Sequence, residues 1–490
     1  MSDIVNKLWG MCHTLRHDGI DYGDYIEQLT YLLFLKMADE KGINLPKNCD
    51  WDTLKSKSGT ELTDHYLWVL QKLRDEKGLL GDIFAQSMPK FNNPVNLKKI
   101  ITMIDAEEWS SLGVDVKAQA FEGLLEKAAS EGKKGAGQYF TPRVLIQSIV
   151  RLMQPDPLVN KEMKICDPAC GTGGFLVAAY EWLIEKTKGA IPVDEVKRIK
   201  ENTYYGQDLV ARPRRLALMN LFLHGLKPTI YLGDTIYEPD RGERYDVVLT
   251  NPPFGTKGAG QVPTRDDFTI ATSNKQLNFV QHILTILKPG GRAAIVLPDN
   301  CLFEDKAAEV FEIVMNDCNV HTILRLPRGT FVPYAYAQAN VIFLQKGRPT
   351  EKVWIYDNRS NIPSCTKKDR PLTAEMFADF EKCYGKDPNG NSPREDQGPE
   401  GRFRAFTIDE IKERGYKLDI KWLKDDTLDD PNDLPEPTDL ISEAVSELEA
   451  VVDELNEIAD LLGENGGFDS SKKFQQEESI KAKSHTGRQE

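Results

Sequence analysis

The sequence feature that most constrains the fold of this 490-residue chain is an alternation of short strand-like runs with helix-like segments after residue 160. Helical hydrophobic spacing occurs between the first five strand-like runs, for example at 175–188, 214–224 and 276–287. Such alternation predicts an α/β fold with an open, mostly parallel sheet that carries helices on both faces. The seven predicted strands are Met163–Asp167, Thr203–Asp208, Thr229–Leu232, Tyr245–Thr250, Arg292–Leu297, His321–Leu326 and Ala339–Gln345.

The last two predicted strands are separated by the loop Pro327–Gln338, which has no room for a crossover helix. They are therefore expected to form an antiparallel hairpin at the edge of the sheet. Residues 1–130 are predicted to form a helical N-terminal domain, because apolar residues recur every three to four positions at 25–37, 66–73 and 121–128. The α/β domain is assigned to residues 131–424.

The acidic residues are concentrated near the C-terminus. Residues 425–465 hold fifteen Asp and Glu residues and no Lys or Arg, and the net charge of the chain is −14, so the rest of the chain is close to neutral. Ile441, Leu448, Leu455 and Leu462 recur at heptad spacing, which predicts an amphipathic helix. This helix either contacts a partner subunit or packs on its own protein. Residues 466–490 are expected to be a flexible tail.

Several classes of protein are disfavoured by what the sequence lacks. The eight cysteines are scattered without a CxxC pair, so neither a disulfide framework nor a metal site is predicted. The longest apolar stretch, near Tyr31–Leu35, is too short to cross a bilayer, and no secretory signal is apparent. There is also no GxxxxGK[ST] phosphate loop. We therefore expect a cytoplasmic protein that does not associate with membranes.

A glycine-rich turn is predicted between the first strand and the following helix, in the sequence Ile165-Cys-Asp-Pro-Ala-Cys-Gly-Thr-Gly-Gly-Phe175. Glycines let a ligand approach the backbone, and the helix start offers free N–H groups. The dinucleotide pattern GxGxxG is not met, because Leu176 occupies the third glycine position. Such a turn can also serve helix packing alone.

Acidic residues end the next two predicted strands. Asp208 is placed to accept hydrogen bonds from ribose hydroxyls, and Asp234 follows Gly233 at a position suited to an adenine amine. Each could instead be a helix N-cap. Because the carboxyl ends of parallel strands line one crevice, the three acidic ends together indicate a nucleoside-like ligand.

The fourth predicted strand runs into Asn251-Pro252-Pro253-Phe254. Two prolines make this turn stiff and prevent a helix from starting there. The Asn251 side-chain oxygen and the Pro252 carbonyl can then accept hydrogen bonds from a single –NH2 group, while Phe254 stacks on the ring that carries the amine. Prolines often close a strand for structural reasons alone, but the added Asn and Phe favour a binding role.

Asp167–Phe175 and Asn251–Phe254 resemble the cofactor and catalytic motifs of DNA N6-adenine methyltransferases that use S-adenosylmethionine. Gly137–Arg143 resembles a further cofactor motif. Over nearly the whole chain, including Gly132–Arg143 and Arg214–His224, the sequence is similar to the modification subunits of type I restriction–modification systems. Cys170 departs from the pattern, where a small Ala or Ser is expected.

The resemblance implies a seven-stranded, Rossmann-like methyltransferase sheet with an antiparallel edge hairpin, preceded by a helical domain and followed by a C-terminal helix. Residues implied to hold the methionine end of S-adenosylmethionine are Gln138, Tyr139, Phe140, Thr141, Pro142, Arg143, Asp167, Gly171, Thr172, Gly173 and Gly174. Asp208 would bind the ribose and Asp234 the adenine of the cofactor. The target adenine would be held by Asn251, Pro252, Pro253 and Phe254, with Phe331, Tyr334 and Tyr336 as further stacking partners.

The implied reaction is methylation of the exocyclic N6 amine of adenine in double-stranded DNA, with the base flipped out and the methyl group transferred directly. The implied partners are a specificity subunit that reads the sequence, a second copy of the modification subunit, and a restriction subunit for cleavage. Alternatives are methylation of another planar amine, in a protein glutamine or an RNA base, and a non-catalytic scaffold. Two basic groups either contact DNA phosphates or form solvated surface: Lys257 with Arg265, and Arg212 with Arg214 and Arg215.

Overall fold

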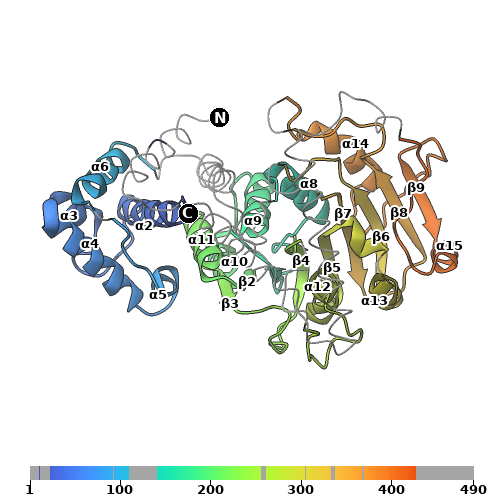
Figure 1. Ribbon diagram of the computed structural model, residues 1–490, viewed down its shortest axis with the longest axis horizontal. Coiled ribbons are helices and arrows are strands. Elements are labelled where there is room, and N and C mark those ends of the chain that lie inside the picture. The colour runs from blue at the N-terminus through green and yellow to red at the C-terminus, as the bar shows by residue number, and fades with distance from the viewer. Residues whose placement is uncertain are drawn as a thin grey trace, which may run out of the picture.

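The computed structural model combines a helical module with a nine-stranded sheet that carries helices on both faces (Figure 1). It describes Gly10 and residues 22–91, 93–109, 141–254, 261–303, 305–332, 337–366 and 369–425. Several predicted features lie outside these ranges: the helix predicted at Phe121–Ala128, Gln138 to Phe140, Lys257, Tyr334, Tyr336, all but the first residue of the acidic segment 425–465, and the tail 466–490.

The helical module contains α2 (Tyr22–Glu40), α3 (Trp51–Ser56), α4 (Gly59–Arg74), α5 (Leu79–Phe84) and α6 (Pro94–Asp105). Helix α2 is apolar on most of its surface, and its residues from Tyr31 to Leu35 are buried. Local signals set the starts of its neighbours. The Asp50 carboxylate accepts a hydrogen bond from the Thr53 amide at 2.7 Å, and Asn93 caps α6 ahead of Pro94. The helices predicted at 25–37 and 66–73 are confirmed.

The strands are β1 (Ile165–Asp167), β2 (Tyr204–Asp208), β3 (Thr229–Leu232), β4 (Tyr245–Thr250), β5 (Leu287–Pro298), β6 (Cys318–Arg325), β7 (Ala339–Lys346), β8 (Lys352–Asp357) and β9 (Phe403–Thr407). Their order in the sheet is β3-β2-β1-β4-β5-β7-β6-β8-β9. The first five pair in parallel, and β7 runs antiparallel to both neighbours.

All seven predicted strands are present, but the strand count and the place of the hairpin were wrong. Strand β8 pairs in parallel with β6, and β9 pairs antiparallel with β8, so the β6–β7 hairpin lies inside the sheet. Without β8, the edge of β6 that faces away from β7 would have unpaired backbone N–H and C=O groups, and β8 pairs with them. Residues 385–401 connect α14 (Glu375–Tyr384) to β9 without helix or strand, and Arg394 fastens this loop to Thr322 at 2.9 Å.

Two hydrophobic cores lie on opposite faces of the sheet, which confirms the prediction of helices on both sides. One face packs against α8 (Arg143–Met153), α9 (Gly174–Thr187), α10 (Val193–Asn202), α11 (Ala211–Leu223) and α14. The other packs against α12 (Lys275–Ile286) and α13 (Asp305–Asp317). Strand β1 shows the alternation directly, because Ile165 belongs to the first core and Cys166 to the second. The short η1 (Asp299–Leu302) and α15 (Ile408–Glu413) follow β5 and β9.

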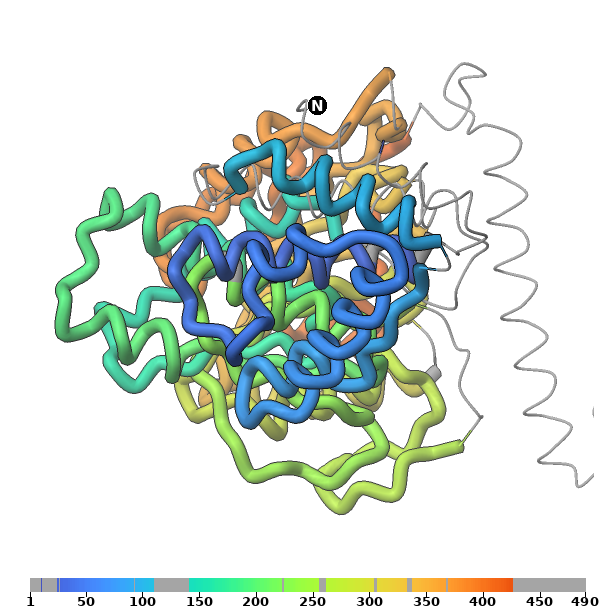
Figure 2. The backbone as a smooth tube through the Cα atoms, turned by 90° about the vertical axis from the view of Figure 1, so that its left-hand side faces the viewer, coloured from blue at the N-terminus to red at the C-terminus, as the bar shows by residue number. Residues whose placement is uncertain are grey.

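Helix α11 lies between the helical module and the sheet, and the module stands in front of the sheet in the side view (Figures 1 and 2). The arginines at its start make the contact. Arg212 pairs with Asp24 at 2.5 Å, Arg214 pairs with Asp82 at 3.0 Å, and Arg215 pairs with Glu27. The sequence-based interpretation of this cluster as a solvated basic face is therefore wrong for Arg214 and Arg215, whose side chains are 14% and 6% exposed, whereas the Arg212 side chain remains 42% exposed. The charges of the cluster are neutralised by carboxylates of the module.

Among the described residues, no helix is both long and apolar enough to cross a membrane.

Candidate functional site

Four polar residues from distant parts of the chain come together at the carboxyl ends of neighbouring parallel strands. Asp167 and Asp208 end β1 and β2, Asp234 lies two residues after β3, and Asn251 directly follows β4. Because β3, β2, β1 and β4 are adjacent in the sheet, these residues line one edge of it. This is the crevice in which open α/β sheets bind ligands.

The glycine-rich turn adopts the backbone that its sequence predicted. Gly171 and Gly173 have φ angles of +51° and +80°, a region that residues with a Cβ rarely occupy. Helix α9 begins at Gly174 without a side-chain N-cap hydrogen bond. Its first amide groups are thus left for a ligand or solvent, which is the arrangement of an anion-binding helix start.

Two carboxylates flank the turn, and Asp167 is buried whereas Asp208 is partly exposed. Asp167, 2% exposed, accepts hydrogen bonds from the Thr250 hydroxyl at 2.7 Å and the Ala169 amide at 3.1 Å. Asp208 accepts from the Gly171 amide at 3.0 Å and the Val210 amide at 2.8 Å. Burial raises the pKa of Asp167 to about 7 and the pKa of Asp208 to about 6. Carboxyl groups with perturbed pKa values in a crevice are typical of a functional site.

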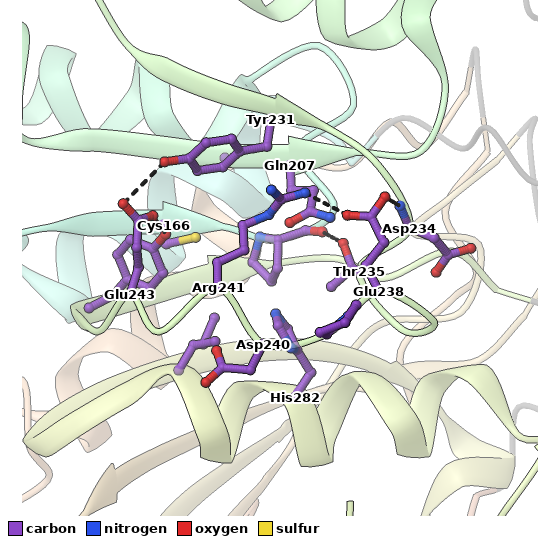
Figure 3. Close-up of a pocket in the computed structure, with 15 residues that line it drawn as sticks. Cys166, Gln207, Tyr231, Asp234, Thr235, Glu238, Asp240, Arg241, Glu243 and His282 are labelled. Carbon is purple, nitrogen blue, oxygen red and sulfur yellow. Dashed lines mark hydrogen bonds and ion pairs between the residues drawn. The ribbon is translucent and has the colours of Figure 1, made fainter. Parts of the chain in front are cut away.

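Asp234 caps the turn after β3, and its Oδ1 atom accepts from the amides of Ile236 and Tyr237 at 2.9 and 3.1 Å. The next residue ties this turn to the glycine turn, because the Thr235 hydroxyl donates to the Pro168 carbonyl at 2.7 Å. A pocket opens beside these residues, with Asp234 and Thr235 on one side and His282 of α12 below them (Figure 3). Of the described residues, no three His, Cys, Asp or Glu side chains gather in a way that could hold a metal ion.

Arg265 supports this region from within the protein. Its guanidinium donates to the Thr235 carbonyl at 2.7 Å and pairs with Asp267 at 2.5 Å, and its side chain is 4% exposed. It also contacts His282, whose pKa burial lowers to about 3, so this imidazole is neutral. Neither alternative given for Arg265, a contact to DNA phosphates or a solvated basic surface, fits a guanidinium that is buried and paired with Asp267.

The Asn251 turn is held from two sides. The Asn251 Nδ2 atom donates to the Thr141 hydroxyl at 2.9 Å, and Gln276 of α12 donates to the Pro253 carbonyl at 2.9 Å. The Oδ1 atom of Asn251 is buried, and no described residue donates a hydrogen bond to it. A buried acceptor without a donor is costly, so one that lies in a crevice is available to a donor on a ligand.

Phe254 and Phe331 form an edge-to-face pair with ring centroids 5.3 Å apart and an interplanar angle of 84°. Phe331 is 1% exposed and therefore supports the Phe254 ring instead of offering its own face to a base. In this arrangement the stacking role predicted for Phe331 is replaced by a supporting one.

The described residues of the segment Gly137–Arg143, Thr141 to Arg143, lie next to the crevice. Thr141 contacts Asn251, Pro142 precedes α8, and the Arg143 Nη2 atom donates to both carboxylate oxygens of Glu181 on α9, at 3.0 and 2.8 Å. Burial alone would raise the pKa of Glu181, but His224 and Arg143 together hold it below its ordinary value. The segment thus bridges α9 and the Asn251 turn.

Four supporting residues escaped the sequence analysis. Thr250 joins the tips of β1 and β4, Gln276 fixes the Pro253 carbonyl, and Asn220 donates to the Thr172 carbonyl at 3.1 Å. His224 contacts Glu181. Thr250 immediately precedes Asn251, which was a usable signal. Gln276 and Asn220 lie inside helices and His224 caps the end of α11, and a helical pattern says nothing of their partners.

Comparison with known proteins identifies the family of the chain. A family model described as N-6 DNA Methylase matches residues 113–427, and one described as HsdM N-terminal domain matches residues 4–104. The type I restriction enzyme EcoKI methylase subunit of Escherichia coli (strain K12) is 38% identical, over 97% of this chain and 98% of that protein. The StySJI methylase subunit of Salmonella typhimurium is also 38% identical, over 96% and 98%.

Solved structures give the same result. The crystal structure of the EcoKI M protein has 33% identity and a TM-score of 0.54, over 97% of this chain and 99% of that chain. A structure concerned with complex assembly of the type I R-M system has 27% identity and a TM-score of 0.70, over 95% and 99%.

The family model and the solved structures agree that the chain has the fold of a DNA methyltransferase. The chain belongs to the N-6 DNA methylase family and, within it, to the modification subunits of type I restriction–modification systems, which are adenine-specific DNA methyltransferases.

Proposed function

We propose that the Asn251–Phe254 turn holds the target adenine by its exocyclic amine, while the tips of β1, β2 and β3 hold S-adenosylmethionine. The observation that carries this proposal is the buried Oδ1 atom of Asn251, which receives no donor from the described residues. The other end of the same amide is fixed by Thr141 at 2.9 Å, so the acceptor has a set direction.

The residues of the crevice fit the proposed cofactor. Gly171, Thr172, Gly173 and Gly174 form a turn with little side-chain bulk ahead of the open start of α9, suited to the charged methionine end. Asp208 accepts ribose hydroxyls, and the Oδ2 atom of Asp234, which no described residue contacts, accepts the adenine amine. Asp167 and the segment Gln138 to Arg143 complete this end of the site. When bound, S-adenosylmethionine supplies a methyl group on a positively charged sulfur.

The Asn251 turn prepares the nucleophile. The lone pair of the adenine amine is delocalised into the ring, which makes the nitrogen a weak nucleophile. Hydrogen bonds from the amine to Asn251 Oδ1 and to the Pro252 carbonyl favour a pyramidal nitrogen with its lone pair free for attack. Positioning of the amine would supply most of the barrier reduction. The methyl group would pass directly from the sulfonium sulfur to the adenine nitrogen, which leaves the sulfur as a neutral thioether. The nitrogen would then release its proton to solvent.

The target base is flipped out of the duplex. The exocyclic amine of a paired adenine lies inside the helix, whereas the proposed acceptors lie in a crevice of the protein. Phe254, braced edge-on by Phe331, offers a stacking surface that offsets roughly 1–3 kcal/mol of the lost base stacking.

Further subunits are proposed on the strength of the relatives, which are methylase subunits of type I restriction enzymes. A specificity subunit would read the DNA sequence, a second copy of this chain would methylate the other strand, and a restriction subunit would join for cleavage. The acidic segment 425–465 is proposed as a subunit contact. A DNA substrate and these partners support the proposal that the protein acts in the cytoplasm.

The test is Asn251→Ala in the complex assembled with its specificity subunit. Transfer of labelled methyl groups to duplex DNA should fall by at least a thousandfold, while calorimetric binding of S-adenosylmethionine stays within threefold of wild type. Digested DNA should contain N6-methyladenine only with the wild-type chain. Transfer at the wild-type rate by the variant, or label in protein glutamine or RNA instead of DNA, would refute the proposal.

A further inference from the structure

Helix α11 contacts two parts of the protein that are far apart in sequence. At its start, Arg212 and Arg215 pair with Asp24 and Glu27 of α2. The Arg215–Glu27 pair is largely buried, with side-chain exposures of 6% and 13%. Arg215 also donates to the Ala85 carbonyl and lies over the Tyr31 ring. Removing one partner of such a pair would leave a buried charge without compensation. The pair therefore favours one position of α11 on the module.

The second half of α11 supports the glycine turn. Ala217 and Leu221 pack directly against Gly173. A methyl group at that glycine would lie 3.3 Å from Leu221 Cδ1 and 3.4 Å from Ala217 Cβ. Between them Asn220, 4% exposed, donates its Nδ2 hydrogen to the Thr172 carbonyl at 3.1 Å. The Gly173 amide at the other end of the same peptide unit donates to the Cys170 carbonyl at 2.7 Å. The Thr172–Gly173 peptide plane is therefore held from both sides.

The end of α11 is connected through Glu181 to Arg143 in the segment Gly137–Arg143. His224 is bonded through Nδ1 to the Asn220 carbonyl at 2.7 Å, and its Nε2 atom lies 3.6 Å from Glu181 Oε1. Glu181 in turn holds Arg143 at 2.8 Å. One helix thus connects the module to both segments that are proposed to bind the methionine end of the cofactor.

We propose that Asn220 is a positioning residue for cofactor binding, and that α11 makes the geometry of the glycine turn depend on its ion pairs with the N-terminal helical module. The inference rests on the proposed cofactor site. It adds to that site a residue that does not touch the cofactor and a contact through which the module controls cofactor affinity. It also links the supporting residues Asn220 and His224 of the segment Arg214–His224 to the module.

The direct test is the affinity of the full-length chain for S-adenosylmethionine, measured by calorimetry for wild type and Asn220→Ala. Loss of the donor frees the Thr172 carbonyl, and the dissociation constant should rise roughly fivefold to twentyfold. The turnover number of the assembled complex at saturating cofactor should stay within twofold. This split between affinity and turnover separates positioning from general loss of structure.

A matched control is Asn358→Ala. Asn358 is also buried, at 3% exposure, and donates to a backbone carbonyl, that of Met376, at 2.9 Å. It follows β8, five strands away from β1 in the sheet. It should lose comparable thermal stability while its cofactor affinity remains unchanged. Equal affinity for wild type and Asn220→Ala, or an equal loss in both variants, would overturn the role of Asn220.

Asn220→Ser serves if the Ala variant does not fold. Its hydroxyl keeps a polar group in the buried position but ends too short to reach Thr172, so the same loss of affinity is expected. Retained wild-type affinity in the Ser variant would count against Asn220 as a positioning residue.

The second arm of the test is Glu27→Gln, which keeps the volume of the side chain and removes its charge. Glu27 lies in α2, and its printed partners Tyr31, Arg212 and Arg215 are not residues of the crevice. The dissociation constant of the Glu27→Gln chain for S-adenosylmethionine should nevertheless rise roughly threefold to tenfold. Unchanged affinity in a folded Glu27→Gln chain would overturn the control by the module. Failure of the wild-type chain to bind S-adenosylmethionine at all would instead refute the proposed function, so the two failures are distinguishable.

Discussion

The raised pKa of Asp208 predicts that cofactor binding depends on pH. Burial raises the pKa of Asp208 to about 6, so the free protein carries a proton on this carboxyl at pH 5. Ribose hydroxyls donate to the ionised form, so binding lowers this pKa and releases the proton. One unit below the pKa only about a tenth of the carboxyl is ionised, and the dissociation constant should therefore be about tenfold higher at pH 5 than on the plateau above pH 7.

Calorimetry between pH 5 and 8 measures this dependence, and a pair of buffers with different ionisation enthalpies counts the released protons. The control is Asp208→Asn, which binds weakly but should lack the Asp208 contribution to the slope. Asp167, whose pKa burial raises to about 7, is retained in both proteins, so the difference between them isolates Asp208. A dissociation constant that is flat from pH 5 to 8 in the wild type, or equally steep in the variant, would refute the assignment of Asp208 to the ribose.

Three further perturbations test the other parts of the site. Thr141→Val removes the acceptor that holds the Asn251 amide, so the turnover number should fall about 10–100-fold with cofactor affinity nearly unchanged; a wild-type rate would show that Thr141 does not orient Asn251. Phe331→Leu removes the brace of Phe254 at a stability cost of about 1 kcal/mol, and 2-aminopurine at the target position should show a smaller rise in fluorescence, whereas a full rise would contradict bracing. Arg265→Met leaves the Thr235 carbonyl without its donor and should lower the free energy of unfolding by about 1–3 kcal/mol without changing the salt dependence of DNA binding; a salt slope smaller by about one would restore a phosphate contact.

The parts of the fold and site that the sequence predicts are those determined locally. Short β-rich runs that alternate with helical segments identified β1 to β7, and the Gly171–Gly174 turn followed from a strand that runs into glycines and then into a helix. Strands β8 and β9, which 45 residues separate in the chain, were missed although they are no shorter than β1 to β3. Their pairing depends on the free edge of β6, which no local pattern reveals.

Charged and amide side chains were harder to assign for the same reason. A sequence shows that Arg212, Arg214 and Arg215 are clustered, but their carboxylate partners lie more than 100 residues away in the module. Likewise Asn220 and Gln276 each act on a backbone carbonyl of another element. The tips of parallel strands are the exception, because the topology of the sheet brings them together whatever the distance in sequence.

The central claim is that this chain places the methyl group on adenine N6 in DNA through Asn251. The most direct measurement is sequencing with modified-base detection of DNA from cells that carry the gene and its neighbours, from cells that lack the gene, and from cells with Asn251→Ala in its place. We predict N6-methyladenine at one recurrent sequence in the first cells and at none of those positions in the other two. Adenine marks that persist with Asn251→Ala, or that are absent with the wild-type gene, would contradict the account.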